Sequence, residues 1–192
     1  MKRKTIISQG RKGAGVYSTF EKLWMMQLRV LLSSERQSLQ ALPKIVYKVS
    51  SPNLKDVLKG YIEITRQQVV RLEQVFSIKD IFARGKKGIA SPGLLEEVLS
   101  VPAHTISGPV RDAGTIAAVQ KIIHYQIAAY DTLTSWSRTL SEERIEQMLT
   151  VASYEEKEAD RLLTEAAYNT INFDAAVDEN KKITASHYNP HL

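Results

Sequence analysis

The sequence predicts an all-α protein built around a four-helix bundle, and three observations support this prediction. Four long segments place apolar residues at steps of three and four, the period of a helix with one buried face. No stretch shows sustained alternation of apolar and polar residues with β-branched enrichment. The 192 residues include only 9 Gly and 6 Pro, which fits a helical protein better than a turn-rich β sandwich.

The apolar stripes and the start signals delimit the four helices. Ser51 and Pro52 favour a helix start, because serine caps the first turn and proline tolerates its first position. Pro109 gives the same signal for the third helix, and Ser141 followed by two glutamates gives a favourable first turn for the fourth. We therefore expect helices over about 18–42, 51–76, 110–136 and 141–166.

The lengths of the connections predict the topology. Short links join the first helix to the second and the third to the fourth, so each pair should form an antiparallel hairpin. Roughly thirty residues, 77–109, separate the two hairpins, and within them 92–99 can form a short extra helix. A crossover of this length can travel along the whole bundle. The prediction is therefore a ferritin-like bundle of two antiparallel hairpins joined by one long crossover.

Composition and charge indicate one domain with two polar ends. Hydrophobic residues make up 43% and charged residues 24%, which excludes wholesale disorder, and the absence of cysteine excludes disulfide scaffolds and thiolate metal sites. The net charge of +5 belongs to the N-terminus, because the remaining 21 basic and 21 acidic residues cancel. We expect a basic tail at 1–17, a bundle at 18–173 and a polar tail at 174–192. The basic residues of the first tail are Lys2, Arg3, Lys4, Arg11 and Lys12.

These features also predict the surroundings of the protein. The basic tail has no apolar core of a signal peptide, and no apolar run approaches the roughly 20 residues that span a membrane. We expect a cytoplasmic protein without membrane contact. The tail is interpreted as a solvated leader, and weak binding of nucleic acid through it is the alternative.

Several polar residues interrupt the apolar faces of the expected helices. A single inward carboxylate is costly unless it is paired, hydrogen-bonded or metal-bound, and each of these acids could instead lie at the flank of its helix and reach solvent. Acids near the faces of three helices together are typical of a carboxylate cage. The interrupting or bordering residues are Glu35, Glu63, Arg66, Gln126, Glu155, Glu156 and Asp160.

Four segments resemble the bacterial YciE/YciF family of ferritin-like proteins. They are 31–39 (LLSSERQSL), 93–97 (GLLEE), 120–130 (QKIIHYQIAAY) and 155–163 (EEKEADRLL), and the third is the most specific. The resemblance covers about 20–173. It implies a relative of rubrerythrin with a metal pair at the bundle centre, dimer formation and a link to stress responses; it does not imply an established activity.

The resemblance also implies a ligand set that this chain has only in part. Glu35 and Glu63 match the glutamates of the first two helices, and the fourth helix keeps Glu155, Glu156 and Asp160. Arg66 stands where the family has a histidine, and Ile123 and Gln126 stand where it has two acids. The five acids are therefore candidates only for a vestigial metal site.

These replacements lead to two functional hypotheses. An arginine cannot become a metal ligand but can fork onto carboxylates, so Arg66 is interpreted as an ion-pair substitute for the metal. The favoured hypothesis is a non-catalytic protein without a cofactor that acts through dimerisation or an unknown protein partner. The alternative is an iron- or manganese-dependent oxidase or peroxide-handling protein with a reduced carboxylate site. A broad apolar surface at Trp24, Met25 and Met26 predicts a homodimer.

Overall fold

The computed structural model describes residues 19–177, and its elements follow the predicted order. In the described residues, every regular element is helical, which confirms the all-α class. The long helices are α1 (Phe20–Val46), α2 (Pro52–Ile78), α4 (Pro109–Thr139) and α5 (Glu143–Ala166). A shorter helix, α3 (Ala90–His104), lies within the crossover, and a π-helical turn, η1 (Ala167–Ile171), follows α5. The helical backbone continues to Val177, and the predicted tails otherwise lie outside the described residues.

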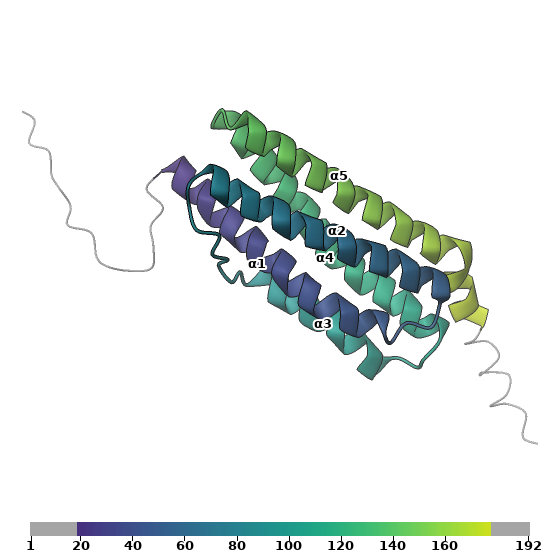
Figure 1. The fold of residues 1–192 in the computed structure, drawn as a ribbon. Helices are drawn as coiled ribbons and strands as arrows, with labels where there is room; N and C mark the ends of the chain where they lie inside the picture. Colours follow the sequence, from purple (N-terminus) through teal and green to yellow (C-terminus); the bar gives the residue numbers. More distant parts are fainter. Residues whose placement is uncertain (1–18, 178–192) are drawn as a thin grey trace, which may run out of the picture.

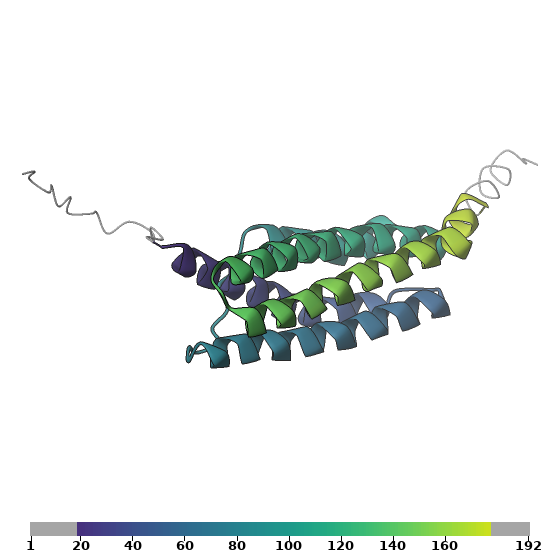
Figure 2. The same ribbon diagram turned by 90° about the horizontal axis from the view of Figure 1, so that it is seen from above.

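The long helices form two antiparallel hairpins, α1 with α2 and α4 with α5 (Figure 1). The crossover carries the chain back along the bundle, so α2 and α4 run in the same direction (Figure 1). In both views the four long helices are roughly aligned, and α3 lies against α1 and α4 on one side of the bundle (Figures 1 and 2). This is the arrangement that the connection lengths predicted. None of the described helices is long and apolar enough to cross a membrane.

Local signals explain where the helices begin. The Thr19 hydroxyl accepts a hydrogen bond from the backbone N–H of Lys22 at the start of α1, and the Ser51 hydroxyl accepts one from Leu54 at the start of α2. Buried Asp112 of α4 accepts hydrogen bonds from the backbone N–H groups of Ser50 (2.9 Å) and Ser51 (2.7 Å). One carboxylate thus fixes the α1–α2 link against the first turn of α4.

The bundle has two apolar cores arranged along its axis. One contains Leu42, Leu58, Val119 and Leu163, and the other contains Trp24, Phe76, Leu133 and Ile145, among other residues. Trp24 is fully buried and its indole N–H donates to the Ser137 hydroxyl (3.1 Å). The expectation that Trp24 contributes to an outer apolar surface is therefore wrong: the indole packs between α1 and α4 within one chain.

We predict that Asp112→Ala lowers the free energy of unfolding by about 2 kcal/mol, because two backbone N–H groups lose a charged acceptor. Urea titration measures the change. Asp56→Ala is the control, since Asp56 forms an exposed ion pair with Lys59, and it should change stability by less than about 0.5 kcal/mol. Equal effects of the two substitutions would contradict the role given to Asp112.

Candidate functional site

A polar layer separates the two apolar cores, and each of the four long helices contributes to it. On each long helix, the polar residues of the layer lie in the sequence between side chains of one apolar core and side chains of the other. All members of the layer are buried, with at most 1% of their surface exposed. They are Glu35 of α1, Tyr61, Thr65 and Gln68 of α2, Gln126 and Tyr130 of α4, and Glu156 of α5.

A chain of hydrogen bonds links the two buried acids across this layer. Gln126 donates from Nε2 to Glu35 Oε2 (2.7 Å), and its Oε1 lies 2.8 Å from the Tyr61 hydroxyl. The same hydroxyl lies 3.0 Å from Glu156 Oε2. A phenol has one proton, so Tyr61 can donate to only one of these oxygens. If Glu156 is protonated and donates to Tyr61, while Tyr61 donates to Gln126, the whole chain is satisfied.

The pKa values of the two acids support this proton arrangement. Burial, opposed by the Tyr61 and Gln68 side chains, raises the pKa of Glu156 to about 8. Burial, and then the nearby charge of Glu156, raises the pKa of Glu35 well above its usual range. Burial also raises the pKa of Tyr61 and of Tyr130, whose hydroxyl lies beside Glu35. Neutral carboxyl and phenol groups are therefore the favoured forms in the layer at neutral pH.

Two carboxyl oxygens in the layer have no hydrogen-bond partner among the described residues, Glu35 Oε1 and Glu156 Oε1. The Gln68 side chain donates to the Ala152 carbonyl (3.4 Å), and its own Oε1 is also unpartnered. Burying an oxygen without a hydrogen-bond partner costs less free energy when it belongs to a neutral carboxyl group than when it belongs to a charged carboxylate. The layer is polar but only partly satisfied, which is a further reason for the acids to keep their protons.

Arg66 does not enter this layer, so its interpretation as a substitute for the metal is wrong. Its guanidinium pairs with Glu63 (3.1 Å) on the surface, and about 60% of each side chain is exposed. The helical period explains the difference, because Tyr61, Thr65 and Gln68 form the inward stripe of α2 and positions 63 and 66 lie away from it.

The other predicted site residues also divide between core and surface. Glu155 faces outward and forms a bidentate ion pair with Arg71 of α2 (2.6 and 2.8 Å), which raises the pKa of Arg71. Asp160 accepts from Gln120 (2.9 Å) and lies 3.3 Å from His124, whose side chain is mostly exposed. Ile123 is fully buried in an apolar core. Only Glu35, Gln126 and Glu156 of the predicted set meet in the layer.

Sequence reasoning missed four members of the layer, Tyr61, Thr65, Gln68 and Tyr130, and also the ion pair that Arg71 forms at its rim. The two tyrosines fit the apolar stripes, so the pattern gave no reason to separate them from core residues. Gln68 belongs to the inward stripe of α2 and Arg71 lies three residues further on, at the edge of that stripe. The partners of both residues are on α5. Arg71 could have been found as a second basic residue of α2 able to reach the acids of α5, in addition to Arg66.

Comparison with known proteins identifies the family. A family model described as a domain of unknown function (DUF892) matches residues 19–176. The chain belongs to the DUF892 family. YciF of Escherichia coli K12 is 35% identical over 164 residues, which cover 85% of this chain and 97% of YciF. These matches confirm the resemblance inferred from the sequence.

Solved structures of similar proteins confirm the fold. The crystal structure of the E. coli stress protein YciF matches with a TM-score of 0.77 and 33% identity, covering 81% of this chain and 98% of that one. YcfI from Rhodopseudomonas palustris matches with a TM-score of 0.75 and 31% identity, covering 83% and 98%.

The layer of this DUF892 chain does not fit a di-metal centre. Such a centre in a ferritin-like bundle uses a Glu from each of two helices and a Glu-x-x-His pair from each of the others. Here the layer offers two carboxyl groups, two amides, two phenols and one threonine hydroxyl. Residues 19–177 contain no group of three or more His, Cys, Asp or Glu side chains placed to hold a metal ion. The donor set therefore supplies neither the charge nor the ligand number that two metal ions need.

The raised pKa values predict that stability falls as the pH rises. A carboxyl group with a raised folded-state pKa stabilises the fold fully below its unfolded pKa and loses this contribution as the pH rises through the folded value. For Glu156 the window is from about 4.5 to about 8. The loss is at most about 5 kcal/mol, since one pKa unit corresponds to about 1.4 kcal/mol. Urea unfolding at several pH values measures it.

Glu156→Gln should flatten this decline, and Glu35→Gln with Glu156→Gln should flatten it further, because Glu35 contributes in the same direction. The control is Glu165→Gln, an exposed acid of α5, which should keep the parent slope. A parent protein whose stability rises from pH 5 to pH 8 would contradict the assignment.

Proposed function

We propose that this chain is a non-catalytic member of its family, with a proton-bearing polar layer at the place where the resemblance to ferritin-like proteins implies a metal pair. The observation that carries the proposal is the bridge formed by Gln126, which donates to Glu35 and lies within hydrogen-bonding distance of Tyr61. An amide can both donate and accept, so it links a carboxyl to a phenol without a charge. The layer is a structural part of the bundle, and the function lies in what the surface binds.

The proposed role is stress-associated, by analogy with the YciF relative that is described as a stress protein. The chain would act through a homodimer or a protein partner. No part of this role uses a cofactor. The buried acids are hydrogen-bonded to side chains of the same chain, and the ion pair of Arg71 with Glu155 is partly exposed at the rim.

A second candidate is a metal-dependent oxidase or peroxide-handling protein with one iron or manganese ion. The unpartnered oxygens Glu35 Oε1 and Glu156 Oε1 favour this candidate, because carboxylate oxygen suits both metals. The raised pKa values argue against this candidate, because both carboxyl groups would have to lose a proton although burial favours their protonated forms. Tyr61 and Gln126 would have to remain as their neighbours, and neither adds negative charge.

Metal analysis separates the two candidates. Protein purified without chelator from cells supplied with iron and manganese should contain no tightly bound metal, and Mn²⁺ should leave its melting temperature unchanged. Gln126→Glu should destabilise the metal-free protein by roughly 2–4 kcal/mol, because a third buried carboxyl replaces a donor. Mn²⁺ should then restore stability by binding the native state.

Gln147→Glu is the matched control, since Gln147 is exposed on α5 and the same chemical change should have little effect there. One or two metal ions tightly bound per parent chain would refute the non-catalytic proposal and support the oxidase.

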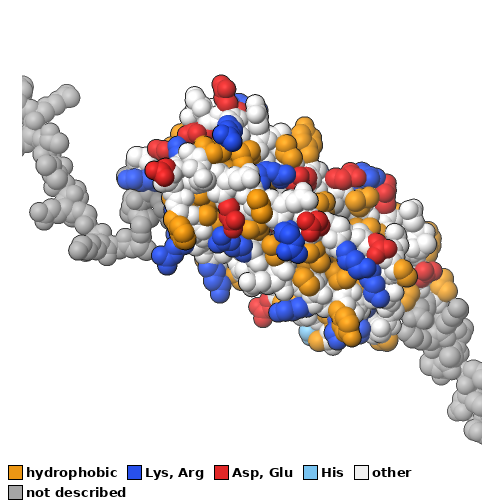
Figure 3. All heavy atoms as spheres, in the orientation of Figure 1, with side chains coloured by type: hydrophobic (Ala, Val, Ile, Leu, Met, Phe, Trp, Pro, Cys, Tyr) orange, Lys and Arg blue, Asp and Glu red, His pale blue; other side chains and the backbone are white. Residues whose placement is uncertain are grey.

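The dimer proposal rests on exposed apolar residues at the outer face of α2 and α5. Val151 and Tyr154 lie three residues apart on α5 and are 48% and 68% exposed, and Val70 of α2 is 50% exposed. The Arg71–Glu155 pair connects the two helices beside them. Figure 3 shows hydrophobic side chains interspersed with charged ones on this side of the molecule. A mixed surface of this kind can form an interface with a charged rim.

We predict that Val70→Glu combined with Tyr154→Glu converts the dimer to a monomer, because it places charges in the apolar part of the interface. Sedimentation velocity at micromolar concentration measures this, and thermal melting shows that the variant is folded. Tyr47→Glu is the control, since Tyr47 is 84% exposed after the end of α1. A parent protein that sediments as a monomer of 21.6 kDa would rule out the dimer.

A further inference from the structure

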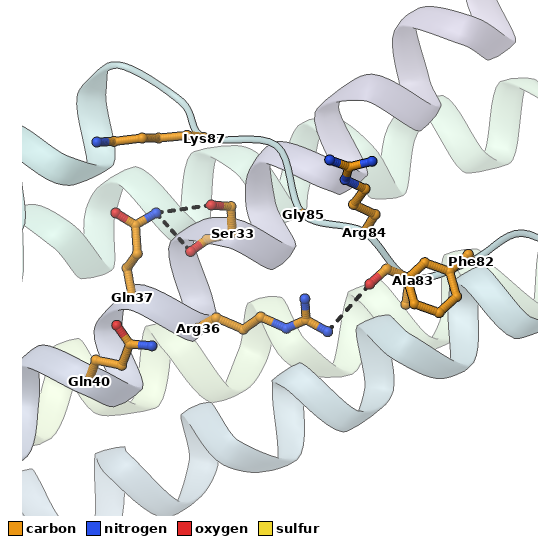
Figure 4. Close-up of a pocket in the computed structure, with 9 residues that line it drawn as sticks. All are labelled: Ser33, Arg36, Gln37, Gln40, Phe82, Ala83, Arg84, Gly85 and Lys87. Carbon is orange, nitrogen blue, oxygen red and sulfur yellow. Dashed lines mark hydrogen bonds between the residues drawn. The ribbon is translucent and has the colours of Figure 1, made fainter.

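The crossover between α2 and α3 forms a pocket with α1, away from the polar layer. The pocket has a volume of about 590 Å³ and is bounded by residues 33–40 of α1 and residues 82–87 of the crossover (Figure 4). Ligand pockets commonly measure about 300–1,000 Å³. None of its lining residues belongs to the buried layer, so an inference about this pocket is independent of the proposed function.

Two glycines allow the crossover to lie directly on α1. A Cβ atom at Gly85 would lie 3.2 Å from Ser33 Cβ, and one at Gly88 would lie 2.9 Å from Val30 Cγ1. Both distances are too short for comfortable packing. Glycine at these positions therefore favours the close approach of the crossover backbone to the helix.

Arginines of α1 hold the crossover backbone in place. Arg29 donates from Nη1 to the carbonyls of Phe82 (3.3 Å) and Arg84 (2.8 Å). Arg36 donates from Nη2 to the carbonyl of Ala83 (3.4 Å), and the same nitrogen pairs with Glu73 (2.8 Å). Three consecutive carbonyls are therefore bound to α1, which fixes the backbone, and the side chains of Phe82, Arg84 and Lys87 line the pocket.

The charge of the pocket is of one sign. Its charged lining residues are Arg36, Arg84 and Lys87, and no acid lines it. Within residues 19–177, Arg84 and Lys87 form no ion pair, whereas Arg36 is partly neutralised by Glu73. Figure 4 shows Lys87 at one end of the pocket and Phe82 at the other, with Arg36 and Gln37 between them. The Phe82 ring is 84% exposed.

We propose that this pocket binds a nucleotide. Guanidinium and ammonium groups without acidic partners suit phosphate oxygens, and arginine can bind two of them at once. Phe82, an exposed aromatic residue at the other end of the same pocket, suits the flat face of a base. A simple inorganic anion would make no stacking contact with Phe82, and an apolar ligand would make no ionic contact with the three cations. A nucleoside triphosphate can make both kinds of contact.

Calorimetric titration of the full chain with ATP, tripolyphosphate and adenosine tests the proposal. ATP should bind more tightly than tripolyphosphate, adenosine should bind weakest, and added salt should weaken the binding of ATP. Phe82→Ala should weaken ATP about five-fold or more and leave tripolyphosphate unchanged, because it removes only the stacking contact. Arg84→Gln with Lys87→Gln should weaken both ligands about ten-fold or more, because charge-assisted contacts are lost.

Lys48→Gln with Arg144→Gln is the matched control, since it removes the same charge from two exposed residues outside the pocket. It should bind ATP as the parent does. An equal loss in this control would show a general charge effect and overturn the proposal, as would failure of the parent to bind ATP at millimolar concentration.

Two further outcomes would also overturn the proposal. If Arg84→Gln with Lys87→Gln changes the sedimentation coefficient but not ATP binding, the pocket is a contact between chains. If a short single-stranded oligonucleotide binds far more tightly than ATP and depends on the same residues, the ligand is a nucleic-acid strand and not a free nucleotide.

Discussion

The bridge from Gln126 to Glu35 and Tyr61 solves the main electrostatic problem of this bundle. Two carboxyl groups lie in the centre of a helical core, where an uncompensated charge is very costly. A bundle can neutralise such groups with a metal ion, with a buried cation or with protons. We propose that this chain uses the third solution, because burial raises the pKa of both acids. The neutral amide of Gln126 donates to Glu35 and can accept from Tyr61 at the same time. The two acids can therefore be connected through hydrogen bonds while neither is charged.

The same physics explains why adjacent glutamates of α5 behave differently. Glu156 points into the layer, and burial raises its pKa to about 8. Glu155 is about a quarter exposed and forms a two-point ion pair with Arg71. The helical turn separates the two side chains by about 100°, which moves one into the core and the other to the rim. The Arg71 cation lies where water still reaches it, whereas Glu156, whose pKa is raised, is fully buried.

The fold was largely predictable from the sequence, because it depends on features that are local in the chain. Apolar periodicity gave the four helices, and connection lengths gave the two hairpins and the crossover. The inward positions of Glu35, Gln126 and Glu156 followed from the same periodicity. The partners did not, because Gln126 is 91 residues from Glu35 and Tyr61 is 95 residues from Glu156. Which residues meet depends on the rotation of each helix about its own axis.

Arg66 and Trp24 show how sensitive this rotation is. The position of Arg66 near the apolar stripe of α2 suggests a place in the core. However, Arg66 follows the inward residue Thr65 by one position, which places it on the surface with Glu63. Trp24 was assigned to an outer surface because it lies beside two methionines, yet it is fully buried against Ser137. A residue at the edge of a stripe can face either way, and the neighbouring helix decides which.

The position of the layer along the bundle has a structural consequence of its own. Apolar cores lie on both sides of it, so sliding one helix by a turn would move a carboxyl group into apolar surroundings and break the bridge. A buried polar group that is satisfied in only one alignment disfavours the others, as a polar residue does in a coiled coil. The layer thereby fixes the alignment of α1 with α4 and of α2 with α5.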